Sequence, residues 1–241
     1  MDKILDFLVS TSKSAYQKIK GFEKELSFKG KKDFLTNCDL EVERFFIEEI
    51  KKHYPKASIV SEEFNADVKK TKECFIVDPI DGTANFSSGS ACWGIQSAYV
   101  QDGECLVACI YLPALDRLYT AIKGEGAFLN AEKITISKET KIENSIVSVG
   151  DMVLKHPEKV SQLVDKVARV RLFGAACYEF SEVARGATNG HLGFGSLSWD
   201  IEPGILLCLE AGAAVHRTDD IHIVACNENM LNCLKEIFNG I

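Results

Sequence analysis

The sequence lacks the features that mark several large protein classes. It has no uninterrupted apolar run approaching the length of a membrane span, no low-complexity tract and no internal repeat. Its nine cysteines are odd in number, scattered and never spaced as CxxC, which argues against a zinc ribbon or a disulfide framework. A net charge of -7 leaves no basic excess for a general nucleic-acid or membrane-surface binder.

What is present is the composition of an ordinary globular protein. Of the 241 residues, 46% are apolar and 26% are charged, so the chain can bury a substantial core in one large domain or two packed halves. Unpaired thiols, together with an N-terminal segment that does not resemble a targeting signal, predict a reduced, cytoplasmic protein. An acidic protein that handles anions needs bound cations.

The stretch Phe75 to Phe86, FIVDPIDGTANF, carries the strongest chemical signal. Its apolar start reads as the end of a buried strand, and Asp78 and Asp81 follow on what we expect to be a short rigid turn broken at Gly82. Two carboxylates beside a glycine whose backbone can approach a ligand closely suit a hard cation and an oxyanion together. The pattern therefore predicts a metal-assisted phosphate site.

Hydrophobic periodicity predicts the elements around this stretch. Before it we expect a helix over 2–20, a mobile polar loop over 28–33, a helix over 40–54 capped by Asp39, and a short buried strand over 57–64 that carries Glu62 and Glu63 near its end. After it, antiparallel strands over 93–137 give way from 144 onward to alternating strands and helices, one of which starts near Asp200. Considered alone, Asp39 and Asp200 read as simple helix caps.

Three stretches together, SEEF with Glu62, DPIDGTANF with Asp78, and WDIEPG with Asp200, resemble the inositol monophosphatase superfamily of magnesium-dependent, lithium-sensitive phosphatases. Thr36 to Asp39, AIKGEGAFLN and FGAACYEFSEVARG are similar to further family segments, so the resemblance covers nearly the whole chain. It implies an α/β (α+β) fold, a layered αβαβα sandwich. An N-terminal α+β half over 1–140 would carry most metal ligands, and a C-terminal α/β half over 141–241 would complete the site.

The resemblance also implies two to three Mg²⁺ ions per site. Glu62, Asp78 and the carbonyl of Ile80 would hold the first, while Asp78, Asp81 and Asp200 would hold the second. Glu62 would place a weaker third ion through water. Magnesium prefers oxygen ligands and keeps several waters, so such a sparse carboxylate cage suits it.

The same resemblance implies the catalytic and substrate-binding residues. Glu62 would orient and deprotonate the attacking water, and Thr83 with Asp39 would form a hydroxyl-carboxylate pair that supports it. Asp200 would also orient the leaving-group oxygen. The implied substrate contacts are Asp81, Gly82, Thr83, Gly174, Ala175, Ala176 and Asp200.

One position departs from the family pattern and leaves the substrate open. Inositol-specific members carry a glutamate seven residues before the metal-binding aspartate, where this chain has Gly193. A myo-inositol monophosphate is one expected substrate, and fructose-1,6-bisphosphate or nucleotide 3′-phosphates are alternatives. Arg169 and Arg171 are candidates for contacting a second phosphate, or equally for packing or a dimer contact. A homodimer with no nucleic-acid or membrane partner is expected.

Two rival functions remain to be weighed. In an EF-hand register with Gly82 at loop position six, Val77 and Ser88 would occupy positions one and twelve, so both essential carboxylates would be missing. The other rival is a non-catalytic regulatory protein that retains the fold. The presence of every expected ligand argues against it, but the sequence leaves it open.

Overall fold

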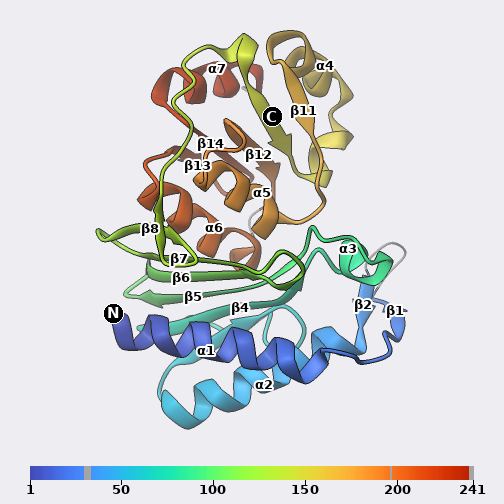
Figure 1. The fold of residues 1–241 in the computed structure, drawn as a ribbon, viewed down its shortest axis with the longest axis vertical. Helices are drawn as coiled ribbons and strands as arrows, with labels where there is room; N and C mark the ends of the chain where they lie inside the picture. The colour runs from blue at the N-terminus through green and yellow to red at the C-terminus, as the bar shows by residue number, and fades with distance from the viewer. Residues whose placement is uncertain (30–33, 196, 239–241) are drawn as a thin grey trace.

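The computed structural model describes residues 1–29, 34–195 and 197–238, and its two large β-sheets are each covered by helices on both faces. Figure 1 shows five layers. From bottom to top in that view they are α1 (Asp2–Ile19) with α2 (Asn37–His53), a seven-stranded sheet, α5 (Ala176–Ala184) with α6 (Ser198–Glu210), a five-stranded sheet, and α4 (Pro157–Lys166) with α7 (Glu228–Phe238). The expected αβαβα sandwich is confirmed.

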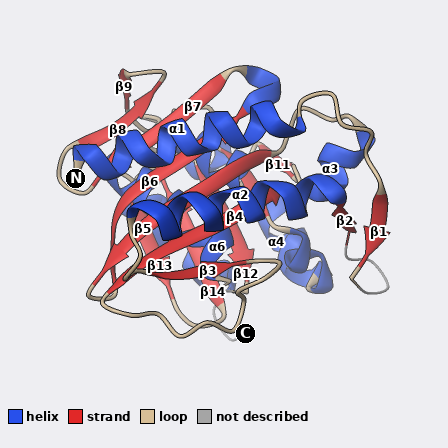
Figure 2. Cartoon of the chain, turned by 90° about the horizontal axis from the view of Figure 1, so that it is seen from below, coloured by secondary structure: helices blue, strands red, loops and turns tan. Residues whose placement is uncertain are grey.

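The seven-stranded sheet runs in the order β3-β4-β5-β6-β7-β8-β9, with β3 parallel to β4 and every other pair antiparallel. Figure 2 shows α1 and α2 lying side by side across this sheet. The strands are β3 (Ser58–Ser61), β4 (Glu73–Asp81), β5 (Gly94–Gln101), β6 (Glu104–Leu112), β7 (Arg117–Ile122), β8 (Gly126–Leu129) and β9 (Glu132–Ile134).

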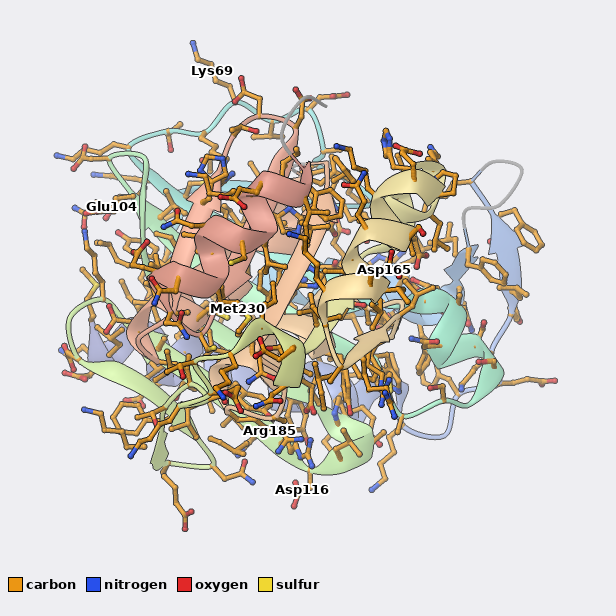
Figure 3. All side chains as sticks on the ribbon, turned by 90° about the horizontal axis from the view of Figure 1, so that it is seen from above. Lys69, Glu104, Asp116, Asp165, Arg185 and Met230 are labelled. Carbon is orange, nitrogen blue, oxygen red and sulfur yellow. The ribbon has the colours of Figure 1, made fainter. Side chains whose placement is uncertain are left out.

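The five-stranded sheet is mixed and runs in the order β11-β10-β12-β14-β13. Strand β10 is parallel to both neighbours, whereas β14 is antiparallel to both of its own. In Figure 3, α4 and α7, marked by Asp165 and Met230, lie next to each other over this sheet. Its strands are β10 (Ile146–Val149), β11 (Arg169–Arg171), β12 (Gly190–Phe194), β13 (Ala214–Arg217) and β14 (Ile221–Ala225).

Short elements complete the described chain. Strands β1 (Leu26–Phe28) and β2 (Phe34–Thr36) form an antiparallel hairpin, and α3 (Thr83–Ser88) follows β4 directly. Three 3₁₀ turns are η1 (Pro113–Leu115), η2 (Ile142–Asn144) and η3 (Asp151–Lys155). The loop predicted over 28–33 falls mainly outside the described residues, since these resume at Phe34; Phe28 itself belongs to β1.

Strand β4 has both faces buried, because helices cover its sheet on each side. Phe75 and Val77 pack into the core under α1 and α2, whereas Cys74 and Ile76 pack on the other face, near Trp199 at the start of α6. Side chains alternate along a strand, so Asp78 follows Cys74 and Ile76 toward the middle layer. This alternation brings the first aspartate of the motif toward Asp200.

Four expectations need correction. Asp78 and Asp81 do not lie on a turn, because β4 continues through Asp81 with a register irregularity between them. Asp39 is not the helix cap: Thr36 is, and Asp39 sits three residues later, where its carboxylate accepts a hydrogen bond from the Thr36 amide. Asp200 lies in the first turn of α6, after its N-cap Leu197. Strand β12 was not expected.

Candidate functional site

The acidic residues predicted from the motifs meet in one cavity of about 440 Å³ at the edge of the seven-stranded sheet. They arrive from three places: Glu62 follows β3, Asp78, Ile80 and Asp81 end β4, and Asp200 begins α6. The described lining includes these residues together with Gly82, Thr83 and Gly174. Of the remaining predicted residues, Asp39 lies behind Thr83, and Ala175 and Ala176 line an adjoining cavity.

Asp78 is the most buried of these acids and has an oxygen without a partner. Its side chain is 1% exposed, and among the described residues nothing hydrogen bonds to Oδ1. Burial, followed by the charges of Glu62, Asp81 and Asp200, raises the pKa of Asp78 well above its ordinary value. A buried carboxylate oxygen without a donor calls for a cation.

The two other aspartates experience the same repulsion. Burial, with the nearby charges of Asp81 and Glu62, raises the pKa of Asp200 to about 8. Burial also raises the pKa of Asp81 to about 6, against hydrogen bonds from the amides of Cys177 and Ala176 that favour the charged form. Three acids that ionise reluctantly in one cavity form a site that a divalent cation would stabilise.

Lys29 forms an ion pair with Glu62, one of the acids of this cavity. Its Nζ donates to Glu62 at 2.7 Å and to Glu63 at 2.5 Å. Although burial lowers it, these two hydrogen bonds hold the pKa of Lys29 above its usual value. In the described part of the chain, no three His, Cys, Asp or Glu side chains are arranged to hold a metal ion.

Asp81 ties the end of β4 to the start of α5. Its carboxylate accepts hydrogen bonds from the first amides of α5, those of Ala176 at 3.2 Å and Cys177, and from Gln96 Nε2 at 3.3 Å. Gly82 follows with a φ of 83°, and a Cβ there would lie 2.7 Å from the Cβ of Ala175. Only glycine therefore lets the end of β4 approach the loop that precedes α5 this closely.

Thr83 and Asp39 form the hydroxyl-carboxylate contact that the motifs suggested. Thr83 Oγ1 lies 3.0 Å from Asp39 Oδ1 and 2.9 Å from the Ile80 carbonyl oxygen, and it can donate to either acceptor. The Thr36 amide donates to Asp39 Oδ2 at 2.9 Å, which fixes the carboxylate. Burial raises the pKa of Asp39, against the hydrogen bonds from Thr36 and Thr83.

Two residues that support the site were not singled out from the sequence. Glu43 is fully buried in α2, and it accepts hydrogen bonds from Ser61 Oγ and from the amides of Glu63 and Phe64, so it holds the turn that carries Glu62. Its position four residues after Asp39, on the buried face of the helix, was the available signal. Asn85 Nδ2 donates to the carbonyls of Cys92 and Phe173, each at 2.7 Å, and so anchors the loop before α5.

A second cavity, of about 390 Å³, adjoins the first. The two share Asp81, Gly174 and Asp200 in their linings, so the second opens beside the acids on the side of the five-stranded sheet. Gly193 and its cross-strand partner His222 belong to its lining. Arg169 and Arg171 are not among the described residues that line either cavity; their guanidinium groups contact the adjacent backbone carbonyls of Ala168 and Val170.

This chain is similar to known proteins over nearly its whole length. Residues 1–232 match the inositol monophosphatase family. The fructose-1,6-bisphosphatase/inositol-1-monophosphatase of Thermotoga maritima is 32% identical over 198 residues, covering 82% of this chain and 75% of that protein. The Nus factor SuhB of Haemophilus influenzae is 31% identical over 258 residues, covering 100% and 96%. A solved structure of an IMPase/NADP phosphatase with Mg²⁺ and phosphate is 26% identical, with a TM-score of 0.85 over 100% of this chain and 95% of that one.

Proposed function

The chain belongs to the inositol monophosphatase family, and from that premise we propose that it is a magnesium-dependent hydrolase of small phosphate monoesters. The observation that supports this most is the convergence of Glu62, Asp78, Asp81 and Asp200 in one cavity, with a buried oxygen of Asp78 left without a donor. A related structure, 26% identical, contains Mg²⁺ and phosphate together.

The proposed metal ligands are those that the motifs implied. Asp78 would bridge two ions, one shared with Glu62 and the Ile80 carbonyl, the other with Asp81 and Asp200. All of these groups line the same cavity, and all offer oxygen, which is the donor that magnesium prefers. Bound magnesium would neutralise phosphate oxygens and lower the pKa of a bound water.

The chain's own residues would then orient the reactants. Asp39, held by Thr36, fixes the hydroxyl of Thr83 at the cavity wall, where it can hold the attacking water in line with the phosphorus. Glu62 is the proposed base for that water. Before it can act, it must leave its ion pair with Lys29, so that contact competes with loading of the site.

The substrate would span the two cavities. Its phosphate would lie by Gly82 and Thr83, with the leaving group passing Gly174, Ala175 and Ala176 and its bridging oxygen near Asp200. A myo-inositol monophosphate is the substrate that family membership favours. Fructose-1,6-bisphosphate is the alternative supported by the name of the Thermotoga maritima relative.

A second candidate function is a regulatory role without catalysis. It is favoured by the full-length similarity to a protein named Nus factor SuhB, at an identity close to that of the phosphatase relatives. The acid cluster favours hydrolysis instead, because burying several carboxylates together is costly and a purely regulatory protein has no evident need for it.

A phosphate-release screen separates these functions. The purified protein would be tested with Mg²⁺, and with EDTA as control, on inositol phosphates, fructose-1,6-bisphosphate, nucleotide 3′-phosphates and NADP. Release that requires Mg²⁺ and falls in millimolar lithium is the expected result. No release from any substrate, in a protein that calorimetry shows to bind Mg²⁺, would favour the regulatory role.

A further inference from the structure

An imidazole ring lines the second cavity beside Gly193. Gly193 on β12 and His222 on β14 are directly paired, and an ideal Cβ on Gly193 would lie 2.5 Å from Cε1 of His222. The ring therefore occupies the space into which a side chain at position 193 would extend. It is only 5% exposed, so the surrounding residues hold it in place.

Both nitrogens of this ring are already engaged. His222 Nδ1 lies 3.2 Å from the carbonyl oxygen of Gly195, which can only accept, so Nδ1 carries the proton. Nε2 is then free to accept from Nε2 of His191 at 3.4 Å. In that tautomer His191 Nδ1 is an acceptor, and it lies 3.0 Å from Ser148 Oγ and 3.3 Å from Glu179 Oε2. Burial lowers the pKa of His222 to about 4, consistent with a neutral ring. Neither nitrogen remains for a substrate hydroxyl.

The wall around the ring is aromatic and aliphatic. Phe180 packs against His191 and His222, with ring centroids 4.9 and 5.6 Å apart. Met152, Phe194, Leu197 and Ile201 supply most of the remaining apolar lining. Such a wall gains free energy from an apolar face. The hydroxyls of a polyol would lose water against this wall, and the side-chain acceptors open to them are the carboxyl groups elsewhere in the lining.

The charged residues of the cavity also disfavour leaving groups that carry a second phosphate. Among the described residues of its lining there is no lysine or arginine, whereas Asp81, Asp151, Glu179 and Asp200 belong to it. A leaving group that carries a second phosphate would meet carboxylates without a compensating side-chain cation.

We propose that His222 is the specificity-determining residue of this cavity, and that it selects phosphate monoesters whose leaving group presents a planar apolar face, such as an aromatic ring, over polyol or bisphosphate substrates. The proposal rests on the proposed function, because it takes the first cavity as the phosphate site. Of the substrates named there, it disfavours myo-inositol monophosphate and fructose-1,6-bisphosphate. It accounts for glycine at position 193: the aromatic wall takes the place of a polar side chain there.

Binding of non-hydrolysable ligands tests this without turnover. Isothermal titration of the Mg²⁺-loaded protein would use methylphosphonate, phenylphosphonate and 2,3-dihydroxypropylphosphonate, which share one head group and differ only in what enters the second cavity. Phenylphosphonate is expected to bind about tenfold tighter than methylphosphonate. The dihydroxypropyl compound should bind no tighter than methylphosphonate. This ranking in the unmodified protein depends on no variant folding.

Two variants test whether the selectivity arises at His222. His222→Ala should reduce the phenyl-to-methyl ratio about fivefold, since the ring that forms the wall is gone. His216→Ala, a matched substitution on the adjacent strand β13 and outside the described lining, should leave the ratio unchanged. Equal phenyl and methyl affinities in the unmodified protein, preference for the dihydroxypropyl compound, or an unchanged ratio in His222→Ala would each overturn the proposal.

A parallel assay of phosphate release from phenyl phosphate tests the proposed function separately from the proposed selectivity. The expected ranking without any release would remove the proposed function and leave the selectivity intact. Release of phosphate without the expected ranking of affinities would support the proposed function and remove the selectivity. Failure of all three phosphonates to bind the Mg²⁺-loaded protein, with no release from phenyl phosphate, would overturn both.

Discussion

Two buried glutamates on α5 differ in whether an arginine pairs with them. Glu182 is 6% exposed and accepts hydrogen bonds from Arg185 Nε at 2.8 Å and Nη2 at 2.6 Å, with Arg117 also in contact. Glu179 is 2% exposed and has no arginine or lysine among its described partners; it accepts from the Phe173 amide and faces His191. Burial raises the pKa of Glu179 to about 8.

Replacing Glu179 should therefore stabilise the protein in alkali. The pKa of Glu179 in the fold, about 8, lies above its ordinary value of 4.5, so its contribution to stability is complete below pH 4.5 and is lost as pH rises through 8. Glu179→Gln has no carboxyl group to ionise at this position, so it does not lose this stability as pH rises. Relative to the unmodified protein, its free energy of unfolding should rise by about 3 kcal/mol between pH 4.5 and pH 8.5. Urea unfolding at the two pH values measures it.

Glu182→Gln is the control on the same helix. Because it removes a paired charge, it should destabilise the protein by about 1–3 kcal/mol at neutral pH. A Glu179→Gln difference that does not change with pH, or a gain in Glu182→Gln, would contradict the contrast drawn between the two residues.

At the scale of elements, the sequence predicted most of the fold because most elements carry a clear hydrophobic period. The stripe of α1 and the antiparallel strands from β5 to β8 were expected close to their observed bounds. Strand β12 was missed because its sequence, GHLGF, has two glycines and a buried histidine, and its pairing on both sides is what makes it a strand. The position of His222 opposite Gly193 could not be predicted, since register is a tertiary property.

The contact between α5 and α6 gives a prediction at this scale. An alanine usually stabilises a helix by about 1 kcal/mol relative to glycine. In α6, however, a Cβ on Gly204 would lie 2.8 Å from the Cβ of Phe180 and still closer to its fully buried ring. Gly204→Ala should therefore lower the free energy of unfolding by about 2 kcal/mol.

A double mutant checks that the loss comes from this clash. Thermal or urea unfolding of Gly204→Ala/Phe180→Leu should show a loss smaller than the sum of the two single losses by about 1 kcal/mol or more. Additive losses, or a stable Gly204→Ala protein, would mean that the two helices can move apart at little cost.

At the scale of the whole molecule, the acids of the site come from segments far apart in the chain. Glu62, Asp78 and Asp81 precede residues 135–145, the segment that connects the two sheets, and Asp200 follows it. The motifs identified these acids because each keeps a local sequence pattern. Division at residue 140 stays a prediction, and one core cluster joins Ile110 of the first sheet to Phe180 and Leu207 of the middle helices. We therefore expect the two parts to fold together.

The cellular location and the oligomeric state of the protein remain predictions. All nine cysteines are free thiols, and in the described chain no helix has the length and apolarity needed to cross a membrane. A homodimer is still expected, and sedimentation equilibrium should give about twice the chain mass of 26.6 kDa. A single species at the chain mass would contradict it.

The central claim is that the acid cluster is a magnesium centre for phosphate release, and Asp78→Asn tests it most directly. The substitution keeps the shape of the side chain and removes the charge of the proposed bridging ligand. With the best substrate from the screen, Mg²⁺-dependent release should fall at least about a hundredfold, while circular dichroism shows an intact fold. Asp102→Asn, an exposed change in the turn between β5 and β6, should release phosphate at the unmodified rate. Unchanged release by Asp78→Asn would contradict the account.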